Sequence, residues 1–93
     1  MDGKMLVARC AGLIEADVDG EMVALNIEQG NFCGFNATAT QVWRLIEQPR
    51  TLDAICDALM REHIVDRETC MRDVSALLDT LRQEGLVTVS TAA

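Results

Sequence analysis

IEQGNFCGFN, residues 27–36, is the stretch that decides how this chain folds. Gly30 predicts a turn, because glycine adopts a positive φ at no steric cost. The five residues that follow read as an extended strand with Phe32 and Phe35 on opposite faces. Asn36 is a good N-cap, since its side chain can accept a hydrogen bond from an unpaired N–H of a first helical turn. The stretch therefore predicts a turn, a short strand and the entry to a helix.

Two alternating segments precede this stretch and predict a sheet. Polar and apolar residues alternate over residues 13–18 and again over residues 21–27. The dipeptide Asp19-Gly20 between them is a strong signal for a two-residue hairpin turn. We expect these segments and residues 31–35 to form a three-stranded antiparallel sheet. The ends of the chain, residues 1–10 and 91–93, are weakly patterned and are expected to be loose.

Three helices are expected after the sheet. The first runs from Ala37 to about Glu47 on apolar residues at helical spacing, and Pro49 ends it. Thr51 caps the second helix and Asp66 caps the third.

Gly85 stops the third helix in the left-handed conformation, and a short strand at residues 86–90 follows. The predicted fold class is α+β, with a three-stranded antiparallel sheet followed by three helices in a layout like that of a winged helix-turn-helix. Residues 1–93 are expected to form a single domain.

Charge and composition exclude several classes of partner. Fifteen acidic side chains against eight basic ones give a net charge of −7, which disfavours nucleic acid and anionic membranes. The sequence contains no signal peptide and no apolar run of 18 residues, so we expect a cytoplasmic protein with no membrane partner.

The residues that could take part in catalysis or metal binding form no recognisable site. His63 is the only histidine, and no partner lies at catalytic spacing from it. Trp43 lies on the apolar stripe of the first predicted helix and is interpreted as a core residue. The four cysteines match neither a zinc site nor a disulfide framework: Cys10, Cys33, Cys56 and Cys70. We expect no catalytic residue, no metal and no cofactor.

The helix-turn-helix layout raises one alternative of a different class, a DNA-binding regulator. Its reading helix would be residues 66–84, which hold five acids against at most four bases even when neighbouring Arg61 is counted. Phosphates would repel a helix with this balance, so the charge argues against DNA binding.

Several motifs, in order and spacing, resemble one known family. They are VALN, GNFCGFNATA and VW within residues 23–43, PRTL at residues 49–52, DV, LL and L in the third predicted helix, and EGLV at residues 84–87. The chain resembles the PqqD-like family, also called RiPP precursor-peptide recognition elements, from about Leu13 to Val89. The family often has an aromatic pair where this chain has Phe32-Cys33, which makes the wall at Cys33 smaller.

The resemblance implies a peptide-binding function. Members of the family bind the leader of a ribosomally made precursor peptide, which joins the sheet as an extra strand beside the third strand, while the third helix forms the other wall of a groove. Residues 31–35 carry no charge and no proline that would block such pairing. The alternative is that another segment of the chain, such as residues 5–10, already covers this edge.

The expected peptide-binding residues follow from this arrangement. If Val74, Leu78 and Leu81 face the core, helical spacing turns a different flank of the third helix towards the edge strand. The candidate residues are Asn31, Phe32, Cys33, Gly34 and Phe35 on the strand, and Asp73, Ala76, Leu77 and Thr80 on the helix. Ala76→Trp is expected to fill the groove, and proline at Cys33 to weaken binding by removing a donor or by disrupting the sheet.

The resemblance also implies a maturation enzyme as second partner. The short length and the run Pro49-Arg50-Thr51 favour the lasso-peptide branch, in which the enzyme would be a separate leader peptidase and the leader resembles a Tyr-x-x-Pro pattern. A PQQ-type system or a radical-SAM enzyme is the alternative within the family.

Overall fold

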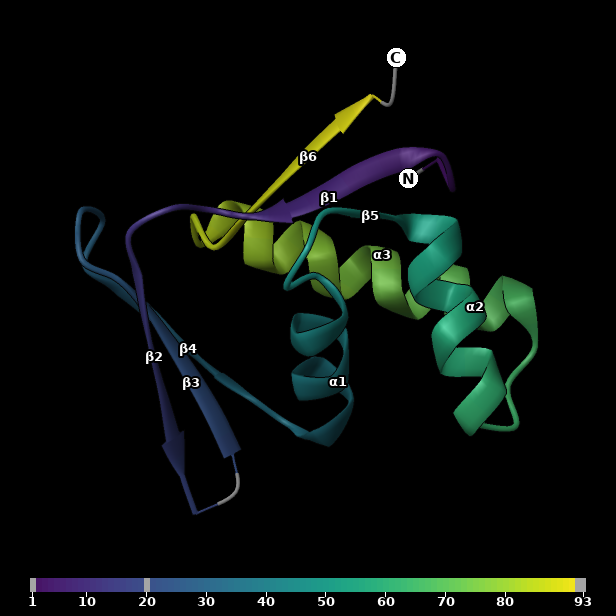
Figure 1. The fold of residues 1–93 in the computed structure, drawn as a ribbon, viewed down its shortest axis with the longest axis horizontal. Coiled ribbons are helices and arrows are strands. Elements are labelled where there is room, and N and C mark those ends of the chain that lie inside the picture. The colour runs from purple at the N-terminus through teal and green to yellow at the C-terminus, as the bar shows by residue number, and fades with distance from the viewer. Residues whose placement is uncertain (1, 20, 92–93) are drawn as a thin grey trace.

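The computed structural model describes residues 2–19 and 21–91. In chain order their elements are β1 (Met5–Arg9), β2 (Leu13–Val18), β3 (Glu21–Asn26), β4 (Asn31–Phe35), α1 (Ala37–Leu45), β5 (Arg50–Thr51), α2 (Leu52–Glu62), α3 (Arg67–Gln83) and β6 (Val87–Thr91) (Figure 1). The first and last strands, β1 and β6, run side by side (Figure 1).

The predicted three-stranded sheet is present, in the order β2-β3-β4. Val18 pairs with Glu21 at one end of the β2–β3 hairpin, and Asn26 pairs with Asn31 at the turn between β3 and β4. Asp19 adopts a positive φ of 55°, as a tight hairpin turn requires, whereas Gly20 lies outside the described residues. Gly30 has a φ of 71°, which confirms the predicted turn.

A second antiparallel sheet, in the order β5-β1-β6, was not predicted as such. The expectation that residues 1–10 are loose is wrong for Met5–Arg9, because β1 pairs with β6 along its whole length and with β5 at Leu6 and Val7. Val7 is fully buried, so this strand contributes to the core. The expected final strand exists, and its role is to hold β1.

The three predicted N-caps are confirmed by the hydrogen bonds that they accept. The Asn36 side chain accepts from the Ala39 N–H at 2.8 Å, and the side chains of Thr51 and Asp66 accept from the amides three residues later at 3.2 and 2.7 Å. Each bond satisfies an N–H of a first helical turn that has no partner within its helix. The first helix ends at Leu45, two residues before the predicted end.

The C-terminus of α3 forms a Schellman motif. The Leu86 N–H donates to the Leu81 carbonyl at 2.9 Å, and the Gly85 N–H donates to the Arg82 carbonyl at 3.1 Å. Gly85 has a φ of 75°, the left-handed conformation that was predicted for it. This reversal turns the chain from α3 directly into β6.

Trp43 anchors a core that is otherwise mainly aliphatic. Its side chain is fully buried, and its ring lies 5.2 Å from that of Phe35, centroid to centroid. The Arg9 guanidinium lies 4.4 Å from the Trp43 ring centroid and pairs with Glu15 at 3.0 Å. Trp43 also donates its indole N–H to Glu15, so these three side chains tie β1 and β2 to α1. The interpretation of Trp43 as a core residue is confirmed.

Candidate functional site

The outer edge of β4 has no strand beside it among the described residues. β4 pairs with β3 on one side only, and β1, the segment that could have covered the edge, pairs instead with β5 and β6. The five residues of β4 are Asn-Phe-Cys-Gly-Phe, without charge or proline. An edge of this kind is able to accept a further strand.

The register shows which main-chain groups of β4 face this edge. The Gly30 N–H donates to the Asn26 carbonyl at 2.8 Å, so the main-chain groups of Asn26 point towards β4. Successive residues of a strand direct their main-chain N–H and C=O groups alternately to its two sides. Asn31 pairs with Asn26, so the main-chain groups of Asn31 point to β3, and so do those of Cys33 and Phe35, which follow at every second position. Phe32 and Gly34 are left with both N–H and C=O directed outward.

Helix α3 lies beside this edge and runs in the opposite direction. At the start of β4, the Asn31 side chain donates to the Glu84 carbonyl at 3.4 Å, and the Asn26 side chain donates to the Gly85 carbonyl at 2.8 Å. Beyond the other end of β4 a hollow of about 190 Å³ lies between the start of α1 and α3. We call it the strand-end hollow; its lining residues are Asn36, Thr38, Ala39, Asp73, Val74 and Leu77.

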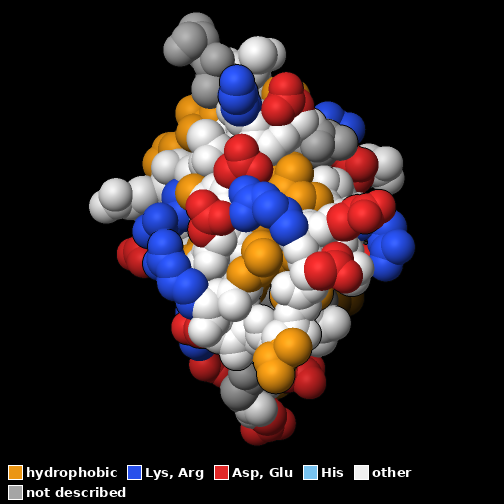
Figure 2. All heavy atoms as spheres, turned by 90° about the vertical axis from the view of Figure 1, so that its right-hand side faces the viewer, with side chains coloured by type: hydrophobic (Ala, Val, Ile, Leu, Met, Phe, Trp, Pro, Cys, Tyr) orange, Lys and Arg blue, Asp and Glu red, His pale blue; other side chains and the backbone are white. Residues whose placement is uncertain are grey.

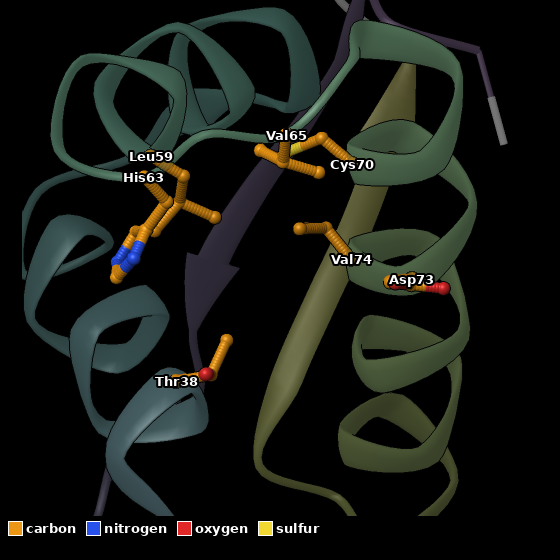
Figure 3. A pocket seen from close by; sticks show the side chains of 7 residues that line it. All are labelled: Thr38, Leu59, His63, Val65, Cys70, Asp73 and Val74. Atoms are coloured by element: carbon orange, nitrogen blue, oxygen red, sulfur yellow. The ribbon is translucent and has the colours of Figure 1, made fainter.

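A second hollow of about 170 Å³ continues from the first towards the end of α2. This helix-end hollow shares Thr38, Asp73 and Val74 with the strand-end hollow and is otherwise lined by Leu59, His63, Val65 and Cys70 (Figure 3). In Figure 3 the side chains of Thr38 and Val74 point into the opening from α1 and α3, whereas the Asp73 carboxylate points away from its centre. The two hollows together offer a mainly apolar path along α3.

The predicted residues of α3 fall into two groups. Asp73 and Leu77 line the hollows, and Val74, Leu78 and Leu81 are buried as predicted. Ala76 and Thr80 are exposed and line neither hollow. Because successive helical residues are rotated by about 100°, Thr80 lies close in angle to Asp73, and Ala76 lies farther out on the rim.

Sequence reasoning did not assign several residues of this region to the site. Asn36, Thr38, Ala39 and Val74 line the strand-end hollow, and Glu84 lies close enough to Cys33 to act on its thiol. Burial, and after it the Glu84 carboxylate, raises the pKa of the half-buried Cys33 thiol, so this wall is neutral at pH 7. The spacing of Glu84, seven residues after Leu77, is a signal that could have found it.

Carboxylates pair with the arginines of α3. Arg67 contacts Asp53 at 2.8 Å and Asp57 at 2.5 Å, and Arg82 contacts Asp79 at 3.0 Å. Basic and acidic side chains are interspersed over the face that includes α2 (Figure 2). A helix whose cations are engaged in this way offers few contacts to phosphates.

No three or more His, Cys, Asp or Glu side chains among residues 2–19 and 21–91 are grouped so that they could hold a metal ion. Within the same residues, no helix has the length and apolar character needed to cross a membrane. His63 is exposed and its Nε2 lies 2.8 Å from the Gln41 side-chain oxygen.

A comparison with models of protein families shows to which family this chain belongs. The family model described as coenzyme PQQ synthesis protein D (PqqD) matches residues 21–87, a range that includes both β4 and α3. The chain belongs to the PqqD family. The predicted resemblance is thereby confirmed, and the groove described above lies between two elements inside the matched range. No curated protein matches the sequence.

Two solved structures are similar to this PqqD-family chain. One is titled "TbiB1 in Complex with the TbiA(beta) Leader Peptide"; it has a TM-score of 0.76 and 31% identity, over 85% of this chain and 93% of that one. The other is titled "Lasso peptide synthetase B1 complexed with the leader peptide"; it has a TM-score of 0.71 and 24% identity, over 88% and 96% of the two chains. The second likeness shows the fold alone, which agrees with the PqqD-like α+β architecture.

Proposed function

We propose that this chain binds the leader segment of a ribosomally synthesised precursor peptide by strand addition to β4, and delivers it to a maturation enzyme. The observation that carries the proposal is the uncovered edge of β4 beside α3. Main-chain hydrogen bonds provide affinity in this mode of recognition, and pockets for alternate side chains provide specificity.

The groove supplies both elements of such recognition. Phe32 and Gly34 offer outward main-chain donors and acceptors to an added strand, and the strand-end and helix-end hollows can receive leader side chains beyond it. Leu77 forms an apolar wall, and Asp73 is available to a basic leader residue in exchange for its contact with Arg72 at 3.4 Å. Ala76 and Thr80 would border the peptide on its solvent side.

The similar solved structures support the lasso-peptide branch. Both are complexes with a leader peptide, and the one at 31% identity extends over most of both chains. In this branch the maturation enzyme is a separate leader peptidase, and this chain is a binding module without catalysis of its own. A PQQ-type or radical-SAM maturation system remains the alternative partner. The four cysteines are free thiols, which fits a cytoplasmic setting where thiols are kept reduced.

A titration of a fluorescently labelled leader with the isolated protein tests the proposal. We expect saturable binding by fluorescence polarisation, and none with a leader of the same composition in scrambled order. The peptide recovered after long incubation should be unchanged in mass. Absence of binding by a folded protein would refute leader recognition, and cleavage or modification of the peptide by the pure protein would refute the non-catalytic role.

A DNA-binding regulator is the weaker candidate. Its reading helix would be α3, whose arginines contact carboxylates. We expect no sequence-preferring mobility shift at physiological salt, where phosphate-driven binding fades.

A further inference from the structure

The β2-β3-β4 sheet has an apolar face with nothing described packed on it. Cross-strand pairing places Ile14, Leu25 and Phe32 in one row and Ala16, Val23 and Gly34 in the next. Ile14, Val18 and Phe32 are 50%, 54% and 70% exposed. The opposite face carries the buried Ala24 and Phe35 and faces α1 (Figure 1). We call the exposed side the outer sheet face; it consists of Ile14, Ala16, Val18, Val23, Leu25 and Phe32.

An apolar face of this kind indicates an interaction surface. Single exposed apolar side chains are ordinary, but contiguous patches on a small protein mark sites of association. Among the described residues, five large hydrophobic side chains are exposed, and three of them lie on this one face. A fourth, Ile27, follows directly after β3. The fifth, Ile64, lies between α2 and α3.

The charges around the outer sheet face are of one sign. Residues 10–43 contain no lysine and no arginine, whereas they contain five carboxylates. Glu15 is paired with Arg9 from outside this segment, and Asp17 lies on the same side of β2 as Glu15, away from the outer sheet face. The other three are Asp19 in the hairpin turn, Glu21 at the start of β3 and Glu28 in the turn after β3. The face over α2 is different, because both signs of charge are mixed there (Figure 2). A partner that covers the outer sheet face should therefore carry lysine and arginine around an apolar centre.

A second copy of this chain does not meet that requirement. Two outer sheet faces in contact would bring acidic segments together, on chains that each carry a net charge of −7. Like charges across an interface select against that pairing. The charge pattern thus favours a different protein.

The position of Phe32 and Gly34 connects this face to the peptide groove. Their main-chain groups point to the free edge of β4, whereas their side-chain positions lie on the outer sheet face. A protein that covers the face would therefore border a peptide strand added to the edge.

We propose that the outer sheet face docks the enzyme that processes the bound leader, through an apolar patch of the enzyme bordered by lysine and arginine. This inference rests on the proposed function, since it assumes a leader on β4. It assigns the edge of the sheet to the peptide and the face of the sheet to the enzyme. The enzyme's active site is thereby brought beside the peptide without contact to the groove.

A matched pair of substitutions tests this assignment. Ile14→Lys places a positive charge on the outer sheet face, on β2 and away from the leader edge, and Ile64→Lys makes the same change between α2 and α3. The probes are the labelled leader and the purified leader peptidase that is encoded with the precursor. We expect Ile14→Lys to weaken peptidase association by about tenfold or more, as loss of a central interface side chain does, with unchanged leader affinity. Ile64→Lys should match the wild type in both assays.

Each other outcome refutes a defined part of the reasoning. Wild-type peptidase association by a folded Ile14→Lys variant, or no association by the wild type, overturns the docking surface. Loss of leader affinity in the folded Ile14→Lys variant assigns the outer sheet face to the leader, and this result also overturns the docking surface for the enzyme. A wild-type dimer in sedimentation velocity that Ile14→Lys dissociates makes a second copy the occupant. Failure of the proposed function is seen separately, as a wild-type protein that does not bind the leader when no enzyme is present.

Discussion

Proline at position 34 is the sharpest perturbation of the proposed groove. The Gly34 N–H points outward from β4, so proline removes a donor that only an added strand would use. Proline is tolerated on edge strands where the missing N–H faces solvent. We therefore expect Gly34→Pro to fold with a melting temperature close to that of the wild type and to lose leader affinity.

The size of the effect follows from the number of groups that the edge offers. Phe32 and Gly34 together present two donors and two acceptors to a leader strand. Removal of one donor leaves a leader carbonyl unpaired in the groove, which costs about 1–3 kcal/mol. At 1.4 kcal/mol for each factor of ten, Kd should rise roughly 5- to 150-fold. The proline ring also occupies space beside the incoming strand, so the upper part of this range is expected.

Two control substitutions make the result decisive. Gly34→Ala keeps the N–H, and its added Cβ meets no atom within 4 Å, so it should bind the leader like the wild type. Cys33→Pro removes an N–H that points to β3, and should lower the melting temperature by breaking the ladder. Fluorescence polarisation gives the affinities, and circular dichroism gives the folded state and the melting temperature. A folded Gly34→Pro protein with wild-type affinity would refute strand addition at this edge, and a stable Cys33→Pro protein would refute the assigned register.

Three further predictions address the helix, its end and its cap. Thr80→Trp should reduce leader affinity more than Ala76→Trp, because Thr80 lies nearer in angle to Asp73; equal affinities of the two variants in the polarisation assay would contradict this. Gly85→Ala should destabilise the fold by about 1–2 kcal/mol in denaturant titration, since φ is 75° and the new Cβ would lie 2.5 Å from the Gln29 side-chain oxygen; unchanged stability would contradict this. The hydrogen bond from the Thr69 N–H lowers the pKa of the Asp66 carboxyl. The ionised Asp66 carboxylate therefore stabilises the fold above the unfolded pKa of about 4, and this stabilisation is lost as pH falls below that value. Asp66→Asn, which keeps a capping oxygen, should therefore melt like the wild type at pH 7 and lose less stability between about pH 4 and pH 2, and an identical acid profile would exclude a role for this carboxyl.

Local interactions explain which parts of the fold could be predicted. The caps at Asn36, Thr51 and Asp66 each involve a side chain and an amide three residues away, and Gly85 acts within the turn that it forms. Such interactions depend on a few neighbouring residues, so the residue types alone are sufficient to indicate them.

Periodicity explains the predicted part of the candidate site. Apolar and polar side chains alternate over residues 13–18 and 21–27, and only one face of each strand can pack against α1. The alternation therefore specifies the register of the three-stranded sheet. Helical spacing on α3 distinguished the buried Val74 from the less buried Asp73 and Leu77, although all three line the strand-end hollow. Helical spacing alone also placed Ala76 and Thr80 among the peptide-binding residues of α3, because spacing does not show how far around the helix the groove extends.

Long-range pairing decided the rest. β1 has little alternation of its own, and its partners lie at residues 50–51 and 87–91, so no local pattern indicates that it forms a strand. Because β1 is held there, the edge of β4 stays uncovered, and the hydrogen bonds from Asn26 and Asn31 fix α3 beside it. Strand pairing between distant segments depends on how the whole chain packs, because each partner gains its hydrogen bonds and burial only when the others are in place. The sequence by itself therefore determined the strand and the helix of the groove, and the tertiary structure determined that they face each other with a free edge between them.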